Sequence, residues 1–187
     1  MNLKRSSLVV AACAALLSVG AVAMTVNQDG APPRPEPAPE HKLLMERLGT
    51  WDCEMQMWMG PGEPERMKGV EKNRALAPFH LVSEFTADMP SMQFEGHGVM
   101  SWDPEKKKFV SLWVDVTEAS PTWMEGTYDA KTRAFHFTGE NMTMGQRLKM
   151  RHVLAIKDAD HATFDMYVTG ADGKESKSMQ IDYTRRK

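Results

Sequence analysis

Apolar and polar residues alternate along most of the chain between Thr50 and Arg186. Successive side chains of a β-strand point to opposite faces of its sheet, so a period of two predicts half-buried strands. Turn-forming Gly, Pro and Asp residues interrupt the alternation about every 8 to 12 residues. The strands predicted in this way span residues 50–59, 66–76, 79–87, 93–102, 109–117, 122–128, 133–140, 147–156, 162–168 and 175–185.

The connections between these strands are too short to hold the crossover helices that a parallel sheet requires. We therefore expect an all-β fold, an up-and-down antiparallel β-barrel of about ten strands, formed by residues 41–187 as a single domain. One short helix is predicted within His41–Leu48, where apolar residues recur at helical spacing and Gly49 provides a stop. We expect this helix to close one end of the barrel.

Four of the predicted strands have one apolar face. On the first strand this face carries Trp51, Cys53, Met55, Met57 and Met59. On the eighth strand it carries Leu148, Met150, His152, Leu154 and Ile156. On the last two strands it carries Phe164, Met166 and Val168, and Met179, Ile181 and Tyr183. We expect these faces to point into the barrel. Gly96 and Gly98, by contrast, lie within a predicted strand and indicate a sharp bend.

The pattern leaves two orientations open for Asp115. This residue and Glu125 lie in neighbouring predicted strands, next to Trp113 and Trp123. On one interior face the two carboxyl groups could orient a ligand or form a coupled acid pair. The alternative turns Asp115 to solvent, because the more apolar face of its strand carries Val110, Leu112, Val114 and Val116.

Residues 1–23 have the features of a secretory signal peptide. Lys4 and Arg5 precede an apolar run over 8–17, and Ala21-Val22-Ala23 fits a cleavage site. Residues 24–40 form a Pro-rich tether that holds the chain extended. We therefore expect an exported protein, periplasmic or extracellular, whose mature chain starts near Met24.

A second processing site overlaps the apolar run. Val10-Ala11-Ala12-Cys13 fits the cleavage site of a bacterial lipoprotein, which would anchor the protein to a membrane through Cys13. The apolar run continues past Cys13, which favours the soluble form. No second apolar run approaches the roughly 20 residues of a membrane-spanning helix.

Export would change the charge and the cysteine content. Loss of Lys4 and Arg5 leaves 21 Lys and Arg residues against 25 Asp and Glu residues, which argues against nucleic acid as a partner. Cys53 would be the sole remaining cysteine, so no internal disulfide could form. Its apolar neighbours on the same face favour a core side chain over a reactive thiol.

Methionine, with 16 residues, supplies the candidate lining of an interior. Met55 and Met57 on one strand face, together with Trp113 and Trp123, are typical of an adaptable apolar surface. A soft-metal alternative exists, because the thioethers of this face or of Met142-x-Met144 could hold Cu(I). We favour the lining and predict no metal or cofactor.

No two of the six histidines have the spacing of a zinc site. His97 lies between two glycines that leave its ring accessible, and His152 lies on an apolar strand face. Each could be a core residue, could hydrogen-bond a ligand or could ligate haem.

Sequence motifs for catalysis are absent: the chain contains no nucleophile elbow, phosphate loop or dinucleotide fingerprint. An enzyme remains an alternative, of hydrolase or isomerase type, with Asp115, Glu125 or His97 as acid or base. A further alternative is an interaction protein of the cell envelope that holds no ligand.

Several short motifs together resemble one bacterial family. They are Gly49-Thr50-Trp51, residues 57–63, Phe94-Glu95-Gly96-His97-Gly98, Trp113-Val114-Asp115, residues 125–129, residues 137–140 and Tyr183-Thr184-Arg185. This set, which covers nearly all of residues 41–187, is similar to the family called domain of unknown function 1579.

Gly49-x-Trp51 with a basic residue ending the last strand also resembles, more distantly, the lipocalin and fatty-acid-binding barrels. That resemblance implies a tryptophan that closes the barrel base and stacks under Arg185 or Arg186. It also implies a small apolar ligand inside. We therefore expect an exported barrel that binds a small apolar or amphipathic molecule in its interior.

Overall fold

The computed structural model describes residues 35–60, 62–89, 92–143 and 146–187. The predicted signal peptide at 1–23 and most of the predicted tether lie outside these residues and remain predictions. The chain divides into two units, and the second unit, Pro37–Lys187, contains the fold. Only this second unit is described below.

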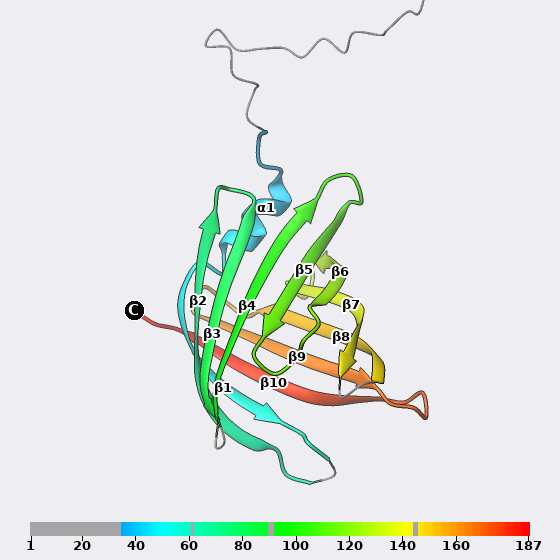
Figure 1. Cartoon of the computed structure of the whole chain (residues 1–187). Coiled ribbons are helices and arrows are strands. Elements are labelled where there is room, and N and C mark those ends of the chain that lie inside the picture. The colour runs from blue at the N-terminus through cyan, green and yellow to red at the C-terminus, as the bar shows by residue number, and fades with distance from the viewer. Residues whose placement is uncertain (1–34, 61, 90–91, 144–145) are drawn as a thin grey trace, which may run out of the picture. The chain divides into compact units, whose positions relative to one another are not determined.

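The described residues form one helix and ten strands (Figure 1). Their bounds are α1 (Pro39–Met45), β1 (Gly49–Met57), β2 (Glu65–Leu76), β3 (His80–Met89), β4 (Met92–Asp103), β5 (Lys108–Asp115), β6 (Thr122–Asp129), β7 (Ala134–Thr143), β8 (Gln146–Ile156), β9 (His161–Thr169) and β10 (Glu175–Arg185). Each strand pairs antiparallel with the strand before and after it, and β1 also pairs with β10, so the barrel is closed. The predicted all-β antiparallel barrel is confirmed.

The helix is shifted from its predicted range: it begins two residues before His41 and ends at Met45, three residues before Leu48. It begins at Pro39, because proline fits the first turn of a helix, where its missing N–H has no partner to lose. The backbone N–H of Ala38 donates to Nδ1 of His41 at 2.9 Å and so caps this turn. The helix therefore takes in the last two residues of the predicted tether.

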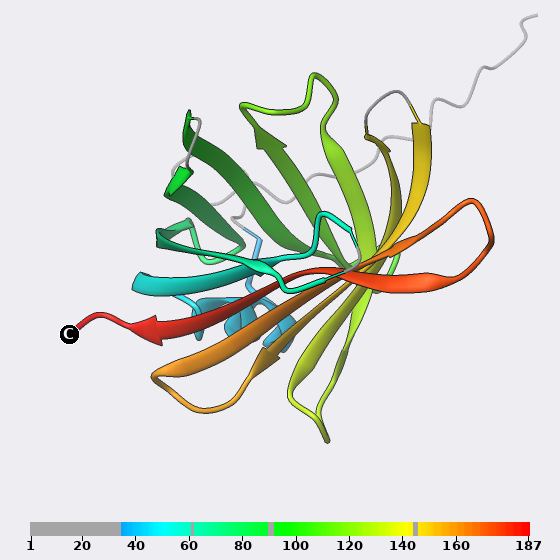
Figure 2. The same ribbon diagram turned by 90° about the horizontal axis from the view of Figure 1, so that it is seen from below.

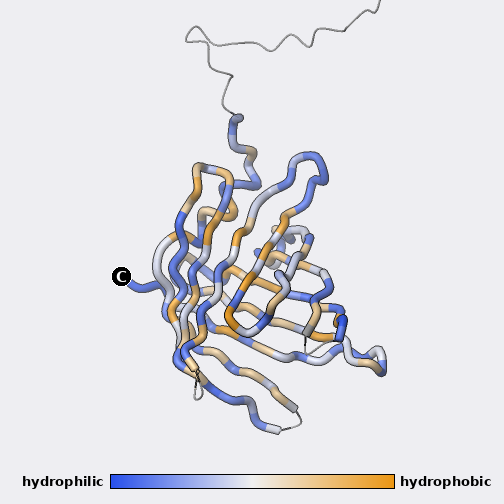
Figure 3. The backbone as a smooth tube through the Cα atoms, in the orientation of Figure 1, coloured by the Kyte–Doolittle hydropathy of each residue, from blue (hydrophilic) through white to orange (hydrophobic). Residues whose placement is uncertain are grey.

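Buried and exposed side chains alternate along the strands, and side-chain hydrogen bonds stabilise the turns, as the sequence pattern predicts. On β1 the side chains of Trp51, Cys53 and Met55 are buried, whereas Asp52 and Glu54 between them are exposed. Figure 3 shows this alternation as short polar and apolar stretches along the backbone. Four turn aspartates each accept a hydrogen bond from the backbone N–H two residues ahead: Asp103, Asp129, Asp158 and Asp172.

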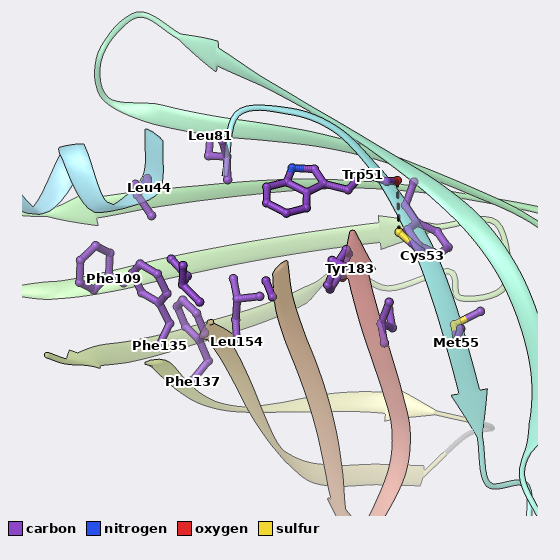
Figure 4. Packing of buried hydrophobic residues seen from close by; sticks show 14 of the residues in the cluster. Leu44, Trp51, Cys53, Met55, Leu81, Phe109, Phe135, Phe137, Leu154 and Tyr183 are labelled. Carbon is purple, nitrogen blue, oxygen red and sulfur yellow. Dashed lines mark hydrogen bonds between the residues drawn. The ribbon is translucent and has the colours of Figure 1, made fainter. Parts of the chain in front are cut away.

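The hydrophobic core lies at the end of the barrel that α1 covers, which we call the closed end. The side chain of Leu44 in α1 is fully buried and packs with Trp51 and Leu81 in one cluster. Aromatic rings continue this cluster, since Phe109 and Phe135 meet edge to face with centroids 4.9 Å apart. Figure 4 shows these residues between α1 and β10, and Figure 2 shows the barrel from below, away from α1. No helix among the described residues is long and apolar enough to cross a membrane.

Candidate ligand-binding interior

Inward-facing side chains differ in burial between the two ends of the barrel. At the closed end most are almost fully buried, as for Trp51 and Phe135, although Trp102 and Tyr128 are half-buried. Toward the opposite end, which we call the open end, most inward-facing apolar residues are only half-buried, so solvent reaches part of their surface; buried Met124 is an exception. The half-buried set, the open-end lining, consists of Met57, Met67, Met89, Phe94, Trp113, Leu148, Met150, Phe164, Met166, Val168 and Met179.

Strand register places four of the inward-facing residues in one row. Met57 of β1 pairs with Met179 of β10, which pairs with Met166 of β9, which pairs with His152 of β8. Directly opposed residues of an antiparallel pair have Cβ atoms about 5 Å apart and point to the same face. The side chains of Met57, Met179 and Met166 therefore lie in a row on the interior wall, and His152 is next in this row.

The imidazole of His152 carries an unused hydrogen-bonding group. Its Nε2 is buried and has no partner among the described residues. The ring of Phe164 meets it edge to face, with centroids 5.0 Å apart. Burial lowers the pKa of His152 to about 4, because the charged form loses its hydration. The ring is therefore neutral at pH 7, with one nitrogen available.

Trp113 and Asp115 form the polar part of the open end. The indole Nε1 of Trp113 donates to Oδ2 of Asp115 at 2.8 Å. The backbone N–H and the hydroxyl of Thr117 both donate to Oδ1 of the same carboxylate, at 2.8 and 2.6 Å. These three hydrogen bonds hold the carboxylate in place, and the carboxylate in turn fixes the plane of the indole.

Two glycines explain why Trp113 faces inward. Gly98 pairs with Trp113 and Gly96 pairs with Asp115 across β4 and β5. A Cβ atom at Gly96 would overlap the indole ring, and one at Gly98 would lie 3.1 Å from its Cε3 atom. The glycines thus make a flat seat for the ring, where the sequence predicted only a bend.

The more apolar face of β5 points outward, because Trp113 packs inward against the two glycines. Of the two orientations left open for Asp115, the one in which Val110, Leu112, Val114 and Val116 point inward is excluded. Asp115 shares the inward face with Trp113, and Val114 and Val116 are 44% and 56% exposed. Both faces of β5 are apolar, so the register with the β4 glycines decides the orientation.

Glu125 lies on the opposite face from Asp115, so the condition for a coupled carboxyl pair is not met. Glu125 pairs with Val110 and shares its outward face. There it bonds to Nζ of Lys106 at 2.6 Å and to Nζ of Lys108 at 3.2 Å. These two ammonium groups lower the pKa of Glu125.

Three other candidates also lie away from the open-end lining. His97 is on the outer face, where its Nε2 lies 3.0 Å from Oε1 of Glu95. The side chain of Trp123 is outward and 53% exposed. Met55 faces inward but is buried in the core. The candidates that the barrel does place on the open-end wall are thus Met57, Trp113, Asp115 and His152.

At the closed end, two guanidinium groups enclose the ring of Trp51. Arg47 lies 4.0 Å from the ring centroid and Arg185 lies 4.1 Å from it. Nη2 of Arg185 also donates to the backbone carbonyl of Glu46 at 2.8 Å. Arg186 instead pairs with Asp52 on the outer face, so Arg185 is the basic residue at the barrel base. Gly49, with φ of 105°, begins the strand beside Arg185.

Arg47 belongs to a buried polar network that sequence reasoning missed. Its Nη2 donates to Oε1 of Glu71 at 2.8 Å, and Nδ2 of Asn73 donates to the same oxygen at 2.7 Å. The guanidinium also lies 4.3 Å from the ring centroid of Tyr183. Burial raises the pKa of this tyrosine well above its ordinary value. The alternation of residues 67–73 could have placed Glu71 and Asn73 inward. It could not have identified Arg47 as their partner, because Arg47 is 24 residues from Glu71 in the sequence.

Comparison with protein families decides the affiliation of the chain. Residues 36–185 match the family described as Protein of unknown function (DUF1579). The chain belongs to this family. The resemblance inferred from the short motifs is therefore confirmed.

One solved structure shares the fold of this DUF1579 barrel. The S-type phycobiliprotein lyase CPES from Guillardia theta is similar with a TM-score of 0.60 and 11% identity, over 79% of this chain and 93% of the lyase. At this identity the likeness shows the lipocalin-like barrel fold alone. A redesigned β-barrel has a TM-score of 0.41 and 14% identity, over 79% of this chain and 95% of that one. No curated protein matches the chain.

The described part of the DUF1579 barrel contains no cluster of three or more His, Cys, Asp or Glu residues arranged to hold a metal ion. Of the methionine segments, Met59 is 68% exposed beyond the end of β1, and Met144 lies outside the described residues.

Two hollows open on the outer surface of the DUF1579 barrel. One, of about 540 Å³, lies over Gly69 and is walled by charged side chains such as Glu54, Lys68 and Asp88. The other, of about 400 Å³, lies over Gly139 beside Lys149 and Arg151. Their walls are exposed and charged, so they lack the apolar surface that small-molecule sites usually provide.

Proposed function

We propose that this DUF1579 barrel binds a small apolar or amphipathic molecule in the open half of its interior. One observation carries the proposal: the open-end lining is inward-facing and apolar, yet its side chains are only partly buried. Leaving large apolar side chains in water forgoes the free energy of burying them, about 25 cal/mol per Å². A bound apolar molecule would recover that free energy.

The composition of the lining fits such a ligand. Met57, Met166 and Met179 are unbranched and adapt to irregular shapes, while the Trp113 indole offers one rigid flat surface. Few polar groups interrupt this wall, as is usual in sites that select small molecules. The similar barrel from Guillardia theta is named as a phycobiliprotein lyase, which supports small-molecule binding as the role of a barrel of this fold.

The positions of the three candidate catalytic residues do not support the enzyme alternative. Asp115 faces inward, whereas His97 and Glu125 lie on the outer face. Acid–base catalysis needs its groups within hydrogen-bond reach of one substrate. These three residues do not meet that requirement.

A fluorescence titration with N-phenyl-1-naphthylamine, a neutral apolar probe, tests the binding proposal. We expect its emission to rise on binding and the variant Met150→Trp, which fills the interior wall, to weaken binding about tenfold or more. Val153→Trp on the outward face of the same strand is the matched control and should bind as the parent does. Equal binding by parent and Met150→Trp, or no binding by the parent, would contradict the proposal.

We also infer that the protein is exported. The basic start, apolar run and Ala21-Val22-Ala23 site of residues 1–23 support this inference. N-terminal sequencing of the protein from its own host tests it. A start near Met24 is the expected result, a lipid-modified Cys13 would indicate a membrane-tethered form, and an intact Met1 would refute export.

A further inference from the structure

Positive charge facing the interior is confined to the closed end. Among the described residues the inward-facing cations are Arg47 and Arg185. Arg47 pairs with Glu71, and Arg185 donates to backbone carbonyl groups. Both guanidinium groups lie at the closed end, so neither can receive an anion in the open half.

Negative charge, by contrast, is present on the open-end wall. Asp115 ends β5 at the open end and faces inward. Glu65, opposite Met57, begins β2 on the same face at the rim. Lys149 and Arg151 of β8 point outward, so their charges lie on the outer surface of the barrel. An anionic ligand would therefore meet only like charge there.

Among the described residues, His152 supplies the one unpaired buried hydrogen-bonding atom of the open half. Two other such atoms, Nη1 of Arg47 and Oδ1 of Asn73, lie at the closed end beside Glu71. An unpaired buried polar atom destabilises the protein, and a ligand group that bonds to it removes that cost. A neutral imidazole nitrogen bonds to a hydroxyl group as acceptor or donor, depending on its tautomer.

We propose that the ligand is an uncharged amphiphile whose hydroxyl or carbonyl group bonds to Nε2 of His152, and that the interior discriminates against carboxylates. The proposal rests on the binding function proposed above and names its ligand class. Moving a carboxylate into an apolar wall that offers no free cation is costly, and Asp115 adds repulsion. A neutral hydroxyl group avoids both costs.

The test compares two probes with the same alkyl chain and different head groups. Dodecan-1-ol and dodecanoate each displace N-phenyl-1-naphthylamine from the full chain at pH 8. We expect the alcohol to displace the dye at a concentration at least about tenfold lower than the carboxylate requires. Equal or stronger displacement by dodecanoate would overturn the proposal.

Two variants assign the preference to named residues. His152→Phe keeps a ring of similar size and removes the nitrogen, so the alcohol should lose about tenfold in affinity while the dye still binds. Asp115→Asn should improve dodecanoate binding and leave the alcohol unchanged. Val153→Leu, an outward substitution on the strand of His152, is the control and should preserve the ratio.

The outcomes separate this proposal from the binding function. A dye that fails to bind the parent protein refutes the binding function itself. A dye that binds, with an alcohol preference that His152→Phe leaves intact, refutes the role of His152 alone.

Discussion

The indole N–H of Trp51 donates to the backbone carbonyl of Arg47 at 2.9 Å, and the guanidinium of Arg47 lies over the same ring. One residue thus holds the tryptophan through both its backbone and its side chain. Because Arg47 precedes β1 and follows α1, this contact joins the helix to the barrel wall. The charge of Arg47 must then be compensated inside the core, and Glu71 does this.

Removing that compensation should destabilise the protein strongly. Glu71→Gln leaves Arg47 as a buried cation without a charged partner, since its side chain is only 3% exposed. We expect a loss of about 3–5 kcal/mol in the free energy of unfolding, measured by urea denaturation. The control Glu54→Gln, on the exposed face of β1, should change it by less than about 0.5 kcal/mol. A Glu71→Gln variant within about 1 kcal/mol of the parent would rule out this role for the pair.

Because the Trp113 indole packs directly on Gly96, we expect any side chain at position 96 to destabilise the protein. Gly96→Ala introduces a methyl group that overlaps the indole, so the ring must move and strain its hydrogen bond to Asp115. We expect a loss of about 1–3 kcal/mol in unfolding free energy and weaker dye binding. Gly60→Ala is the matched control, because no described atom lies within 4 Å of its Cβ position. Similar stability and binding for the two variants would argue against the seat.

His152 should make stability depend on pH. Its pKa is about 4 in the folded protein and about 6.5 in the unfolded chain, so the unfolded chain binds more protons between these values. The stability it contributes is present above pH 6.5 and falls as the pH drops toward 4, by about 3 kcal/mol in total. The flanking inward residues Phe137 and Met166 carry no charge to oppose this.

Unfolding free energies of the parent and of His152→Phe at pH 7 and pH 4 measure this contribution. The variant lacks the titrating group, so its stability should fall less on acidification than that of the parent. Parallel pH curves for the two proteins would show that His152 does not titrate as described.

Cys53 should resist thiol reagents while the protein is folded. Burial and the nearby carboxylate of Glu71 raise the pKa of this thiol to about 12, so almost no thiolate exists at pH 8. In a Cys13→Ser background we expect reaction with a disulfide reagent at least about a hundredfold slower than in denaturing urea. Comparable rates in buffer and in urea would mean that the β1 face is exposed.

The strands and turns could be predicted because their causes are local. Alternation within a strand and an aspartate in a turn each depend on a few neighbouring residues, so predicted 79–87 and 109–117 lie close to His80–Met89 and Lys108–Asp115. The helix was predicted with its start two residues late, because proline at its beginning looked like tether.

The site was only partly predictable because its causes are non-local. The direction of Asp115 depends on Gly96, and the burial of Arg47 depends on Glu71, both on other strands. The inward direction of Met57 and His152 could be predicted from their strand faces alone, whereas that of Trp113 was left open together with Asp115. The ion pairs of Glu125 with Lys106 and Lys108 cannot be seen before the strand register is known, because the lysines lie 19 and 17 residues earlier, at the turn between β4 and β5.

The pairing of Trp51 with Arg185 joins the first strand of the barrel to the last. Contacts so far apart in sequence form late and slowly, because the whole intervening chain must first be ordered. Until β10 has been synthesised, β1 and β9 each keep an unpaired edge that can recruit another chain. Folding to the closed barrel therefore has to wait for synthesis of the final strand, and a chain truncated before β10 is expected to aggregate rather than to persist as a smaller barrel.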